Sequence, residues 1–286
     1  MSFLDRIAAC NNADLTPLLP FTIAGRQVGW VAPGFAERLV AFPDVFAVGG
    51  VTVALAPHLD TPARRSAAVE RALERLAADG VVKGWRGERY PVLPLSSGPQ
   101  GGGKMLMAME RAAIPHFGIR AYGVHMNGFV RRRGGIHLWI GRRAKDKPTY
   151  PGMLDNMVAG GQPVGLSVKE NLLKECREEA AIPRALSRRA RPVGMVSYGY
   201  QGPDGFKPDV LYCYDLELPP DFKPRNTDGE IESFRLWPLA KVAATVRDTE
   251  KFKFNCNLVI IDFLVRHGAI GPDDKDYLAI CQGLRR

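Results

Sequence analysis

The chain has 286 residues, of which 46% are hydrophobic and 24% charged, so it is long enough for one large domain or two modest domains with proper cores. Its formal net charge of +9 favours an anionic partner, and composition alone does not choose among a polyphosphate metabolite, a nucleic acid and an anionic membrane. The five cysteines are scattered, with no close pair of the kind that a zinc site needs, which argues against a disulfide framework and against a zinc module.

The sequence has no apolar run of membrane-spanning length and no signal-peptide core near its first residues. It also lacks the interleaved basic and aromatic residues that are typical of RNA-binding modules. We therefore expect neither a membrane partner nor a nucleic-acid partner. Together with the free thiols, these features predict a cytoplasmic protein.

Residues 1–118 are predicted to form a small α+β domain whose role the sequence does not reveal. Its clearest element is a helix over residues 61–80, which opens with Thr61 and Pro62 in capping order and stops at Gly80. Short apolar runs between turn residues predict strands at 27–32, 45–48 and 51–55. A second helix is predicted over residues 105–113.

The segment GPQGGGK at residues 98–104 nearly matches the phosphate-binding loop of nucleoside triphosphatases. The next residue is Met105, however, where that loop needs a Ser or Thr to bind metal. The preceding apolar run contains Pro91 and Pro94, and prolines are rare in a central strand. We therefore interpret the segment as a flexible loop.

Residues 119–286 alternate predicted strands with predicted helices. Apolar and polar residues alternate over 123–130 and 136–142, which flank a turn and predict a hairpin. The same alternation predicts a second pair of strands at 193–200 and 210–217. Helices are predicted within residues 160–182 and over 239–246 and 257–267.

Three carboxylates, Glu175, Glu178 and Glu179, follow the glycine-rich start of the segment GGQPVGLSVKENLLKECREEAAI at residues 160–182. Positions i, i+3 and i+4 share one face of a helix, so these side chains converge on one spot. Like charges at this spacing destabilise a bare helix, and a hard divalent cation with oxygen ligands removes the repulsion. A solvated acidic face with interleaved basic residues is the alternative.

This segment resembles the Nudix box, whose pattern is a Gly, five residues, a Glu, seven residues, then Arg-Glu-apolar-x-Glu-Glu-x-Gly-apolar. Gly160 stands at the opening glycine, Cys176 at the first apolar position, and the three glutamates match. Leu166 replaces the first glutamate of the pattern, Lys174 replaces its arginine, and Ala181 replaces its closing glycine. Lys cannot copy the planar fork with which Arg orients a carboxylate, so the departures affect detailed geometry.

The resemblance implies a Nudix α/β/α sandwich with a mixed sheet and a C-terminal helical extension over residues 119–286, and Mg²⁺ or Mn²⁺ held by Glu175, Glu178 and Glu179. The longer motifs YGVHMNGFV, YPGMLDNMVAGG, LLKECREEA and NCNLVIIDFLVRHG resemble the Nudix domain fused to fungal thiamin pyrophosphokinase and its stand-alone relatives. That finer resemblance implies hydrolysis of thiamin diphosphate, or of its oxidised analogues, to the monophosphate.

Candidate site residues follow from the same motifs. Glu178 and Glu179 in the box, and Glu230 or Glu232 after it, are candidates for the general base, and Lys174 joins the catalytic set at the arginine position of the box. Turn hydrogen bonds, core packing and a solvated basic loop are the alternatives for several predicted substrate contacts. The predicted substrate contacts are Arg142, Arg143, Asp155, Asn156, Gly160, Gly161 and Tyr200.

The sequence thus predicts a metal-dependent hydrolase that acts on a small, cofactor-like diphosphate. The alternatives are a pyrophosphatase for ADP-ribose or a nucleotide sugar, a non-catalytic ligand-binding domain, and an enzyme similar to isopentenyl diphosphate isomerase. Formation of a monophosphate product separates hydrolysis from the last two. The N-terminal domain shapes the pocket or mediates contacts in a homodimer, and the sequence leaves both roles open.

Overall fold

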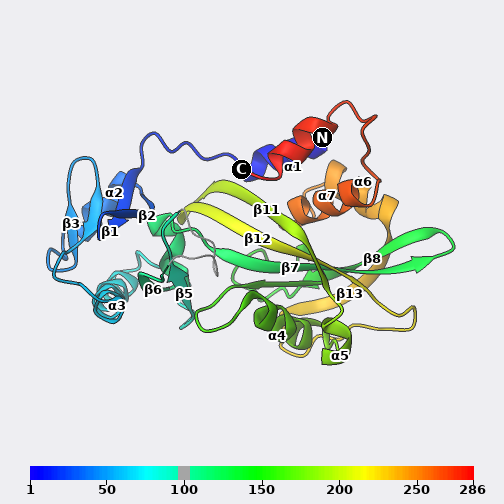
Figure 1. The fold of residues 1–286 in the computed structure, drawn as a ribbon, viewed down its shortest axis with the longest axis horizontal. Helices are drawn as coiled ribbons and strands as arrows, with labels where there is room; N and C mark the ends of the chain where they lie inside the picture. Colours follow the sequence, from blue (N-terminus) through cyan, green and yellow to red (C-terminus); the bar gives the residue numbers. More distant parts are fainter. Residues whose placement is uncertain (96–103) are drawn as a thin grey trace.

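A computed structural model of the chain describes residues 1–95 and 104–286. Its centre is a seven-stranded mixed sheet in the order β11-β12-β7-β8-β13, with β10 beside β7 and β9 beside β8 (Figure 1). The strands are β7 (Tyr122–Arg132), β8 (Gly135–Arg143), β9 (Leu154–Asp155), β10 (Val158–Gly161), β11 (Arg191–Gly202), β12 (Gly205–Glu217) and β13 (Ile231–Pro238). The segment 98–104 lies almost wholly outside the described residues, so its interpretation as a loop stays a prediction.

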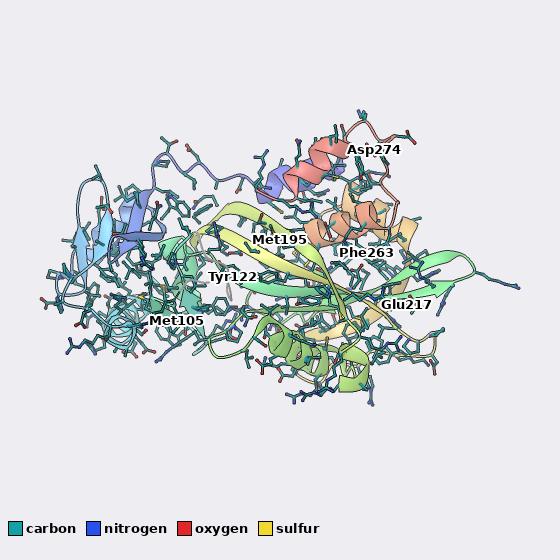
Figure 2. The ribbon with its side chains drawn as sticks, viewed as in Figure 1. Met105, Tyr122, Met195, Glu217, Phe263 and Asp274 are labelled. Carbon is teal, nitrogen blue, oxygen red and sulfur yellow. The ribbon has the colours of Figure 1, made fainter. Side chains whose placement is uncertain are left out.

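Strand β7 lies in the middle of this sheet. It pairs antiparallel with β8, which confirms the predicted hairpin, and parallel with β12. Every side chain from Tyr122 to Val130 is buried, as expected for a strand whose two faces are both covered by helices. Tyr122 marks the end of the sheet that faces the N-terminal part of the chain (Figure 2).

Helices cover both faces of the sheet, so the fold is a mixed α/β sandwich. Helices α4 and α5 pack on one face, and α1, α6, α7 and α8 gather on the other (Figure 1). Helix α7, which carries Phe263 (Figure 2), is buried over nearly its whole length among apolar side chains of the neighbouring elements. The helices are α1 (Phe3–Cys10), α4 (Val168–Ala180), α5 (Arg184–Ser187), α6 (Leu239–Asp248), α7 (Cys256–Arg266) and α8 (Tyr277–Gly283).

Helix α4 carries the predicted carboxylate cluster, and local sequence fixes both of its ends. Ser167 caps the first turn and exchanges hydrogen bonds with Glu170, a capping box worth about 1 kcal/mol. The chain leaves the helix at Ala181, which adopts the left-handed conformation with φ 52°. One helical face, with Leu172 and Cys176, packs on the sheet, so the predicted packing role of Cys176 is confirmed.

The N-terminal part has its own four-stranded sheet, in the order β2-β1-β4-β3, and a two-stranded sheet of β5 and β6. The predicted helix is confirmed as α3, which Thr61 caps and which ends before Gly80 at φ +73°. The elements are β1 (Leu19–Ile23), β2 (Arg26–Val31), α2 (Pro33–Leu39), β3 (Phe46–Val48), β4 (Val53–Leu55), α3 (Pro62–Ala78), β5 (Arg89–Val92), β6 (Met107–Glu110) and the 3₁₀ helix η1 (Arg111–Phe117).

The helix predicted over residues 105–113 is wrong. Strand β6 and the start of η1 occupy this segment instead, and β6 pairs antiparallel with β5. Met107 and Met109 point into the core with the two-residue period of a strand. Pairing with β5 and packing on α3 favour this strand and outweigh the helical propensity of methionine.

Helix α1 belongs by its packing to the C-terminal half, although it opens the chain. It contacts α6, α7 and α8, and the two ends of the chain lie near each other (Figure 1). The Arg6 guanidinium donates to the Val246 carbonyl at 2.9 Å. Residues 1–118 are therefore not one packed unit, and the division of the chain near residue 118 otherwise stays a prediction. None of the described helices is long and apolar enough to cross a membrane.

Candidate active site

The glycine-rich strand β10 runs beside α4, and its two glycines make room for two different side chains. A Cβ atom added to Gly160 would lie 2.3 Å from the carboxyl carbon of Glu175. A Cβ atom added to Gly161 would lie 1.5 Å from the hydroxyl oxygen of Tyr90, which comes from β5 in the N-terminal part. Both glycines, predicted as substrate contacts, therefore serve close packing around the carboxylates.

Glu175 and Glu179 are carboxylates that the fold has taken out of water. Glu179 is 4% exposed, and its Oε2 accepts the Ala159 N–H at 2.7 Å. Burial raises the pKa of Glu179 well above its ordinary value, and the nearby charges of Asp155 and Glu175 add to this shift. Burial also raises the pKa of Glu175, although Lys174 Nζ lies 3.1 Å from its Oε1.

Glu178 differs from its two neighbours because cations surround it. Lys174 Nζ lies 2.9 Å from Oε2 of Glu178, and Arg177 Nη2 lies 2.8 Å from Oε1. Burial works to raise the pKa of Glu178, but these hydrogen bonds and charges outweigh it and lower the pKa. Lys174 thus joins two carboxylates of the cluster with a single point charge, where the box pattern has a forked arginine.

The three glutamates fit a hard divalent cation. Their donors are carboxylate oxygens, the ligands that Mg²⁺ and Mn²⁺ prefer. The raised pKa values of Glu175 and Glu179 show that burial and mutual repulsion leave negative charge here poorly compensated. A divalent cation held by the cluster would supply that compensation.

Of the two predicted candidates after the box, Glu230 is the one whose charge acts on the cluster. Its charge contributes to the raised pKa values of Glu175 and Glu179, and Lys147 Nζ lies 2.8 Å from its Oε1. Glu232 instead faces Arg142 at 3.4 Å, with both side chains nearly half exposed. The register of β13 against β8 shifts between residues 231 and 233, and sequence alternation does not reveal such a bulge.

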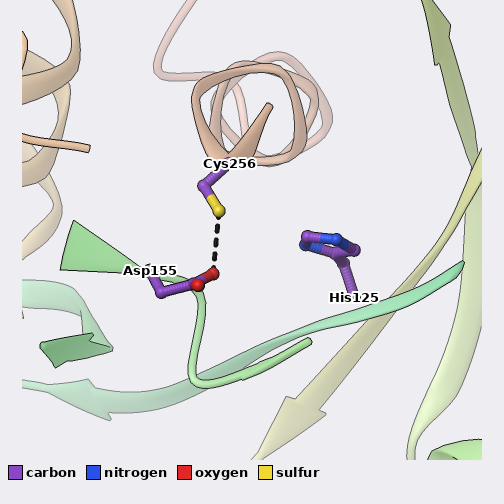
Figure 3. Close-up of side chains that lie close together, drawn as sticks. All are labelled: His125, Asp155 and Cys256. Atoms are coloured by element: carbon purple, nitrogen blue, oxygen red, sulfur yellow. Dashed lines mark hydrogen bonds between the residues drawn. The ribbon is translucent and has the colours of Figure 1, made fainter. Parts of the chain in front are cut away.

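Asp155 and Asn156 belong to a buried polar network behind the glycine loop. The Cys256 thiol donates to Asp155 at 2.8 Å (Figure 3). Arg143 Nη1 lies 2.9 Å from the same carboxylate. The side chain of Asn156 lies 2.8 Å from His125 Nδ1. Arg143 is therefore buried and paired with Asp155, and this position does not favour the predicted contact of its guanidinium with substrate.

His125, Asp155 and Cys256 offer donor atoms within 4.8 Å of one another, which makes them a second candidate metal cluster (Figure 3). Their electrostatic setting favours a structural role instead. Arg143 and Lys253 lower the pKa of Asp155 against the effect of burial, so positive charge already stands at the carboxylate. Burial lowers the pKa of His125 to about 4, which keeps the ring neutral at pH 7.

Tyr200 lies away from the carboxylate cluster. Its ring packs 4.5 Å from that of Phe254, on the face of the sheet that α7 covers, whereas α4 covers the other face. Tyr200 therefore packs against the core, which was the alternative to its predicted role as a substrate contact. Sequence reasoning missed Tyr90 of β5, which reaches the glycine loop from a distant part of the chain and carries no local signal.

Two family models match consecutive parts of the chain. A model described as "Domain of unknown function (DUF4743)" matches residues 2–121, and one described as "NUDIX domain" matches residues 121–258. Two Arabidopsis thaliana proteins, "Nudix hydrolase 20, chloroplastic" and "Nudix hydrolase 24, chloroplastic", are each 47% identical over 99% of this chain and 77% of their own length.

Among solved structures, the NUDIX domain of Shewanella oneidensis NrtR complexed with ADP ribose is 16% identical, with a TM-score of 0.42 over 53% of this chain and 90% of that chain. The names of the two plant relatives contradict the prediction of a cytoplasmic protein, because both relatives are chloroplastic. Free thiols argue only against an oxidising compartment and do not distinguish among compartments that keep thiols reduced.

Proposed function

The chain belongs to the Nudix hydrolase family, and from this premise we propose that it hydrolyses a diphosphate linkage in a small molecule with the help of Mg²⁺ or Mn²⁺. The observation that carries the proposal is the carboxylate cluster on α4, where Glu179 is buried, Glu175 is partly buried beside Gly160, and both have raised pKa values. Bringing like charges together out of water costs free energy, and a bound metal ion would offset that cost. The carboxylate oxygens of this cluster are suitable donors for such an ion.

Glu175, Glu178 and Glu179 would hold the metal, which when bound neutralises phosphate charge and lowers the pKa of water. The side chains around them supply the positioning. The Ala159 N–H fixes one oxygen of Glu179, and Lys174 holds Glu175 and Glu178 together. Glu230, whose charge acts on the cluster, is our first candidate to accept a proton from the attacking water, and Glu178, Glu179 and Glu232 are the other candidates for that role.

Family membership supports a nucleoside-diphosphate-linked substrate. Thiamin diphosphate, or an oxidised analogue, is the finer proposal and rests on the motifs that resemble the Nudix domain fused to fungal thiamin pyrophosphokinase. ADP-ribose and nucleotide sugars are its rivals within the same reaction class. A family member without turnover is the second candidate function, because Lys174 already bonds two of the carboxylates that would bind metal.

The test is a hydrolysis screen of the purified chain, with and without Mg²⁺, against thiamin diphosphate, its oxidised analogues, ADP-ribose, a nucleotide sugar and dinucleoside polyphosphates. Products are identified by mass spectrometry. A thiamin-type monophosphate as the preferred product supports the finer proposal, and preference for a nucleotide supports its rivals. Binding of these compounds without turnover of any of them would favour the non-catalytic alternative.

Glu178→Gln adds a test of the cluster itself. The substitution is nearly isosteric and removes one metal-binding charge, so we expect turnover to fall about 100-fold or more while the melting temperature stays close to that of the wild type. Glu170→Gln is the matched control on the same helix, because Gln also completes a capping box. Full activity of Glu178→Gln would refute the assignment.

A further inference from the structure

The structure assigns a second wall of the active site to the N-terminal part of the chain. We propose that Arg111 is a substrate-binding residue that contacts the phosphate groups of the diphosphate substrate, and that Tyr90 positions it. This inference rests on the proposed function and deepens it, because it gives the N-terminal domain a role in substrate recognition.

Tyr90 docks the N-terminal part directly on the glycine loop. Its side chain is 5% exposed, and its hydroxyl lies so close to the Gly161 Cα that only glycine fits at this position. The Arg89 carbonyl accepts the Val164 N–H at 3.0 Å, which fastens β5 to the same loop. The residue next to Gly161 is Gly160, which packs on Glu175, so Tyr90 stands one residue away from the carboxylate cluster.

Arg111 is the cation that this docking brings to the cluster. Its guanidinium carbon lies 5.5 Å from the centre of the Tyr90 ring, and its side chain is 48% exposed. The charges of Tyr90, Glu88 and Glu230 raise the pKa of Arg111 against the effect of burial. Arg111 thus stands over the ring of the residue that packs on Gly161, the neighbour of the glycine that packs on Glu175.

Buried groups fix where Arg111 leaves the backbone. Glu110, which is 4% exposed, accepts the N–H groups of Arg86 and Ala112 and so sets the start of η1. The Arg111 N–H donates to the Glu88 carbonyl at 2.8 Å. These bonds fix the backbone at Arg111, and the contacts with Glu88 and the Tyr90 ring orient the guanidinium, which reduces the entropy lost when it binds an anion.

Chemistry identifies the ligand of Arg111 as phosphate oxygen. A diphosphate has more negative oxygens than one metal site neutralises, and a planar guanidinium binds two of them at once. Of the arginines of the Nudix part predicted for this task, Arg143 is buried on Asp155, whereas Arg142 is, like Arg111, half exposed and paired with a glutamate. Arg111 Nη1 pairs with Glu88 at 2.8 Å, the guanidinium lies over the Tyr90 ring, and the side chain is 48% exposed.

Arg111→Met tests the proposal, and Arg89→Met is its matched control. Both side chains are about half exposed, at 48% and 52%, each is ion-paired to a glutamate, and Arg89 faces Glu70 on α3. For the diphosphate that the wild type hydrolyses best, we expect Arg111→Met to raise KM about tenfold or more, with a smaller effect on kcat, because a charge-assisted phosphate contact is lost. Arg89→Met should leave both constants unchanged, and Arg111→Lys should restore part of the affinity.

Calorimetry with methylenediphosphonate in Mg²⁺ supplies a readout that is independent of turnover. Its Kd should rise with Arg111→Met and stay constant with Arg89→Met, at equal melting temperatures. An unchanged KM and Kd in Arg111→Met would overturn the inference and leave the proposed function standing. A wild type that hydrolyses no diphosphate would instead remove the proposed function, and the calorimetric comparison alone would then decide whether Arg111 binds phosphate groups.

Discussion

Gly160→Ala should separate activity from stability. A Cβ atom at this position would lie 2.3 Å from Cδ, 2.5 Å from Cγ and 2.6 Å from Oε1 of Glu175, where an ordinary contact begins at 3.4 Å. The carboxyl group therefore has to move by about 1 Å, and it does so by rotation of a flexible side chain without backbone movement. Since a misplacement of about 1 Å at a reacting site costs roughly 100-fold in rate, we expect kcat/KM to fall by about that factor.

The fold should tolerate this change, because the side chain that moves is the only group displaced. We expect the free energy of unfolding to change by less than about 1 kcal/mol. Gly161→Ala is the contrasting variant, since its Cβ would meet the hydroxyl and ring of the buried Tyr90 at 1.5 and 2.6 Å. A rigid ring cannot yield in this way, so that variant should lose about 1–3 kcal/mol.

Denaturant unfolding, hydrolysis kinetics and Mg²⁺ titration of both variants provide the comparison. Full activity of Gly160→Ala would show that the position of Glu175 is not critical, and the metal-ligand role of this residue would have to be abandoned. A large loss of stability in the same variant would show that Gly160 is needed for the conformation of the loop and not only for the position of the Glu175 carboxyl group.

Three further predictions concern charge and metal binding. Burial raises the pKa values of Glu175 and Glu179, so between the unfolded-state and folded-state pKa values the folded protein binds more protons than the unfolded protein. In EDTA, the contribution of this pair to stability should therefore be present at low pH and lost as pH rises through the folded-state pKa values. Mg²⁺ should reverse the loss, and a melting temperature with the same pH dependence with and without Mg²⁺ would contradict this prediction. Asp155→Asn should destabilise the protein by about 3–5 kcal/mol, because it leaves the buried Arg143 without its counter-charge. If His125, Asp155 and Cys256 hold no metal, EDTA should not change the melting temperature of an inactive Glu178→Gln protein.

Local pattern accounts for the parts of the site that depend on one helix. The spacing of Glu175, Glu178 and Glu179 fixes their convergence, and Ser167 with Glu170 fixes where the helix begins, so both follow from sequence. The placement of Glu230 near the cluster depends on a shifted strand register, which no alternation of residues encodes. The same limit explains the wrong helix over 105–113, where pairing with β5 decides the structure.

Tyr90 and Arg111 lie beyond sequence reasoning for a different reason. They come from about seventy and about fifty residues earlier in the chain than the glycine loop, and the docking of β5 on that loop brings Tyr90 to Gly161, with Arg111 over the Tyr90 ring. The cue that sequence did offer was indirect, since two adjacent glycines at 160 and 161 indicate close approach of other groups. Gly160 packs against Glu175, within the Nudix part, and Gly161 packs against Tyr90, which belongs to the N-terminal part.

The departures from the Nudix box leave the carboxylate geometry in place. Ala181 takes the left-handed conformation that the closing glycine would take, at φ 52° and ψ 34°, and accepts a strain of about 1 kcal/mol. Near Leu166, the Gln162 side chain donates to the Leu166 carbonyl at 2.6 Å, and Asn171 donates to the Gly161 carbonyl at 2.8 Å, so the loop before α4 is held without the missing glutamate. Lys174 keeps a positive charge between Glu175 and Glu178. Each departure thus has a local substitute, which favours a working hydrolase over a family member that has lost its chemistry.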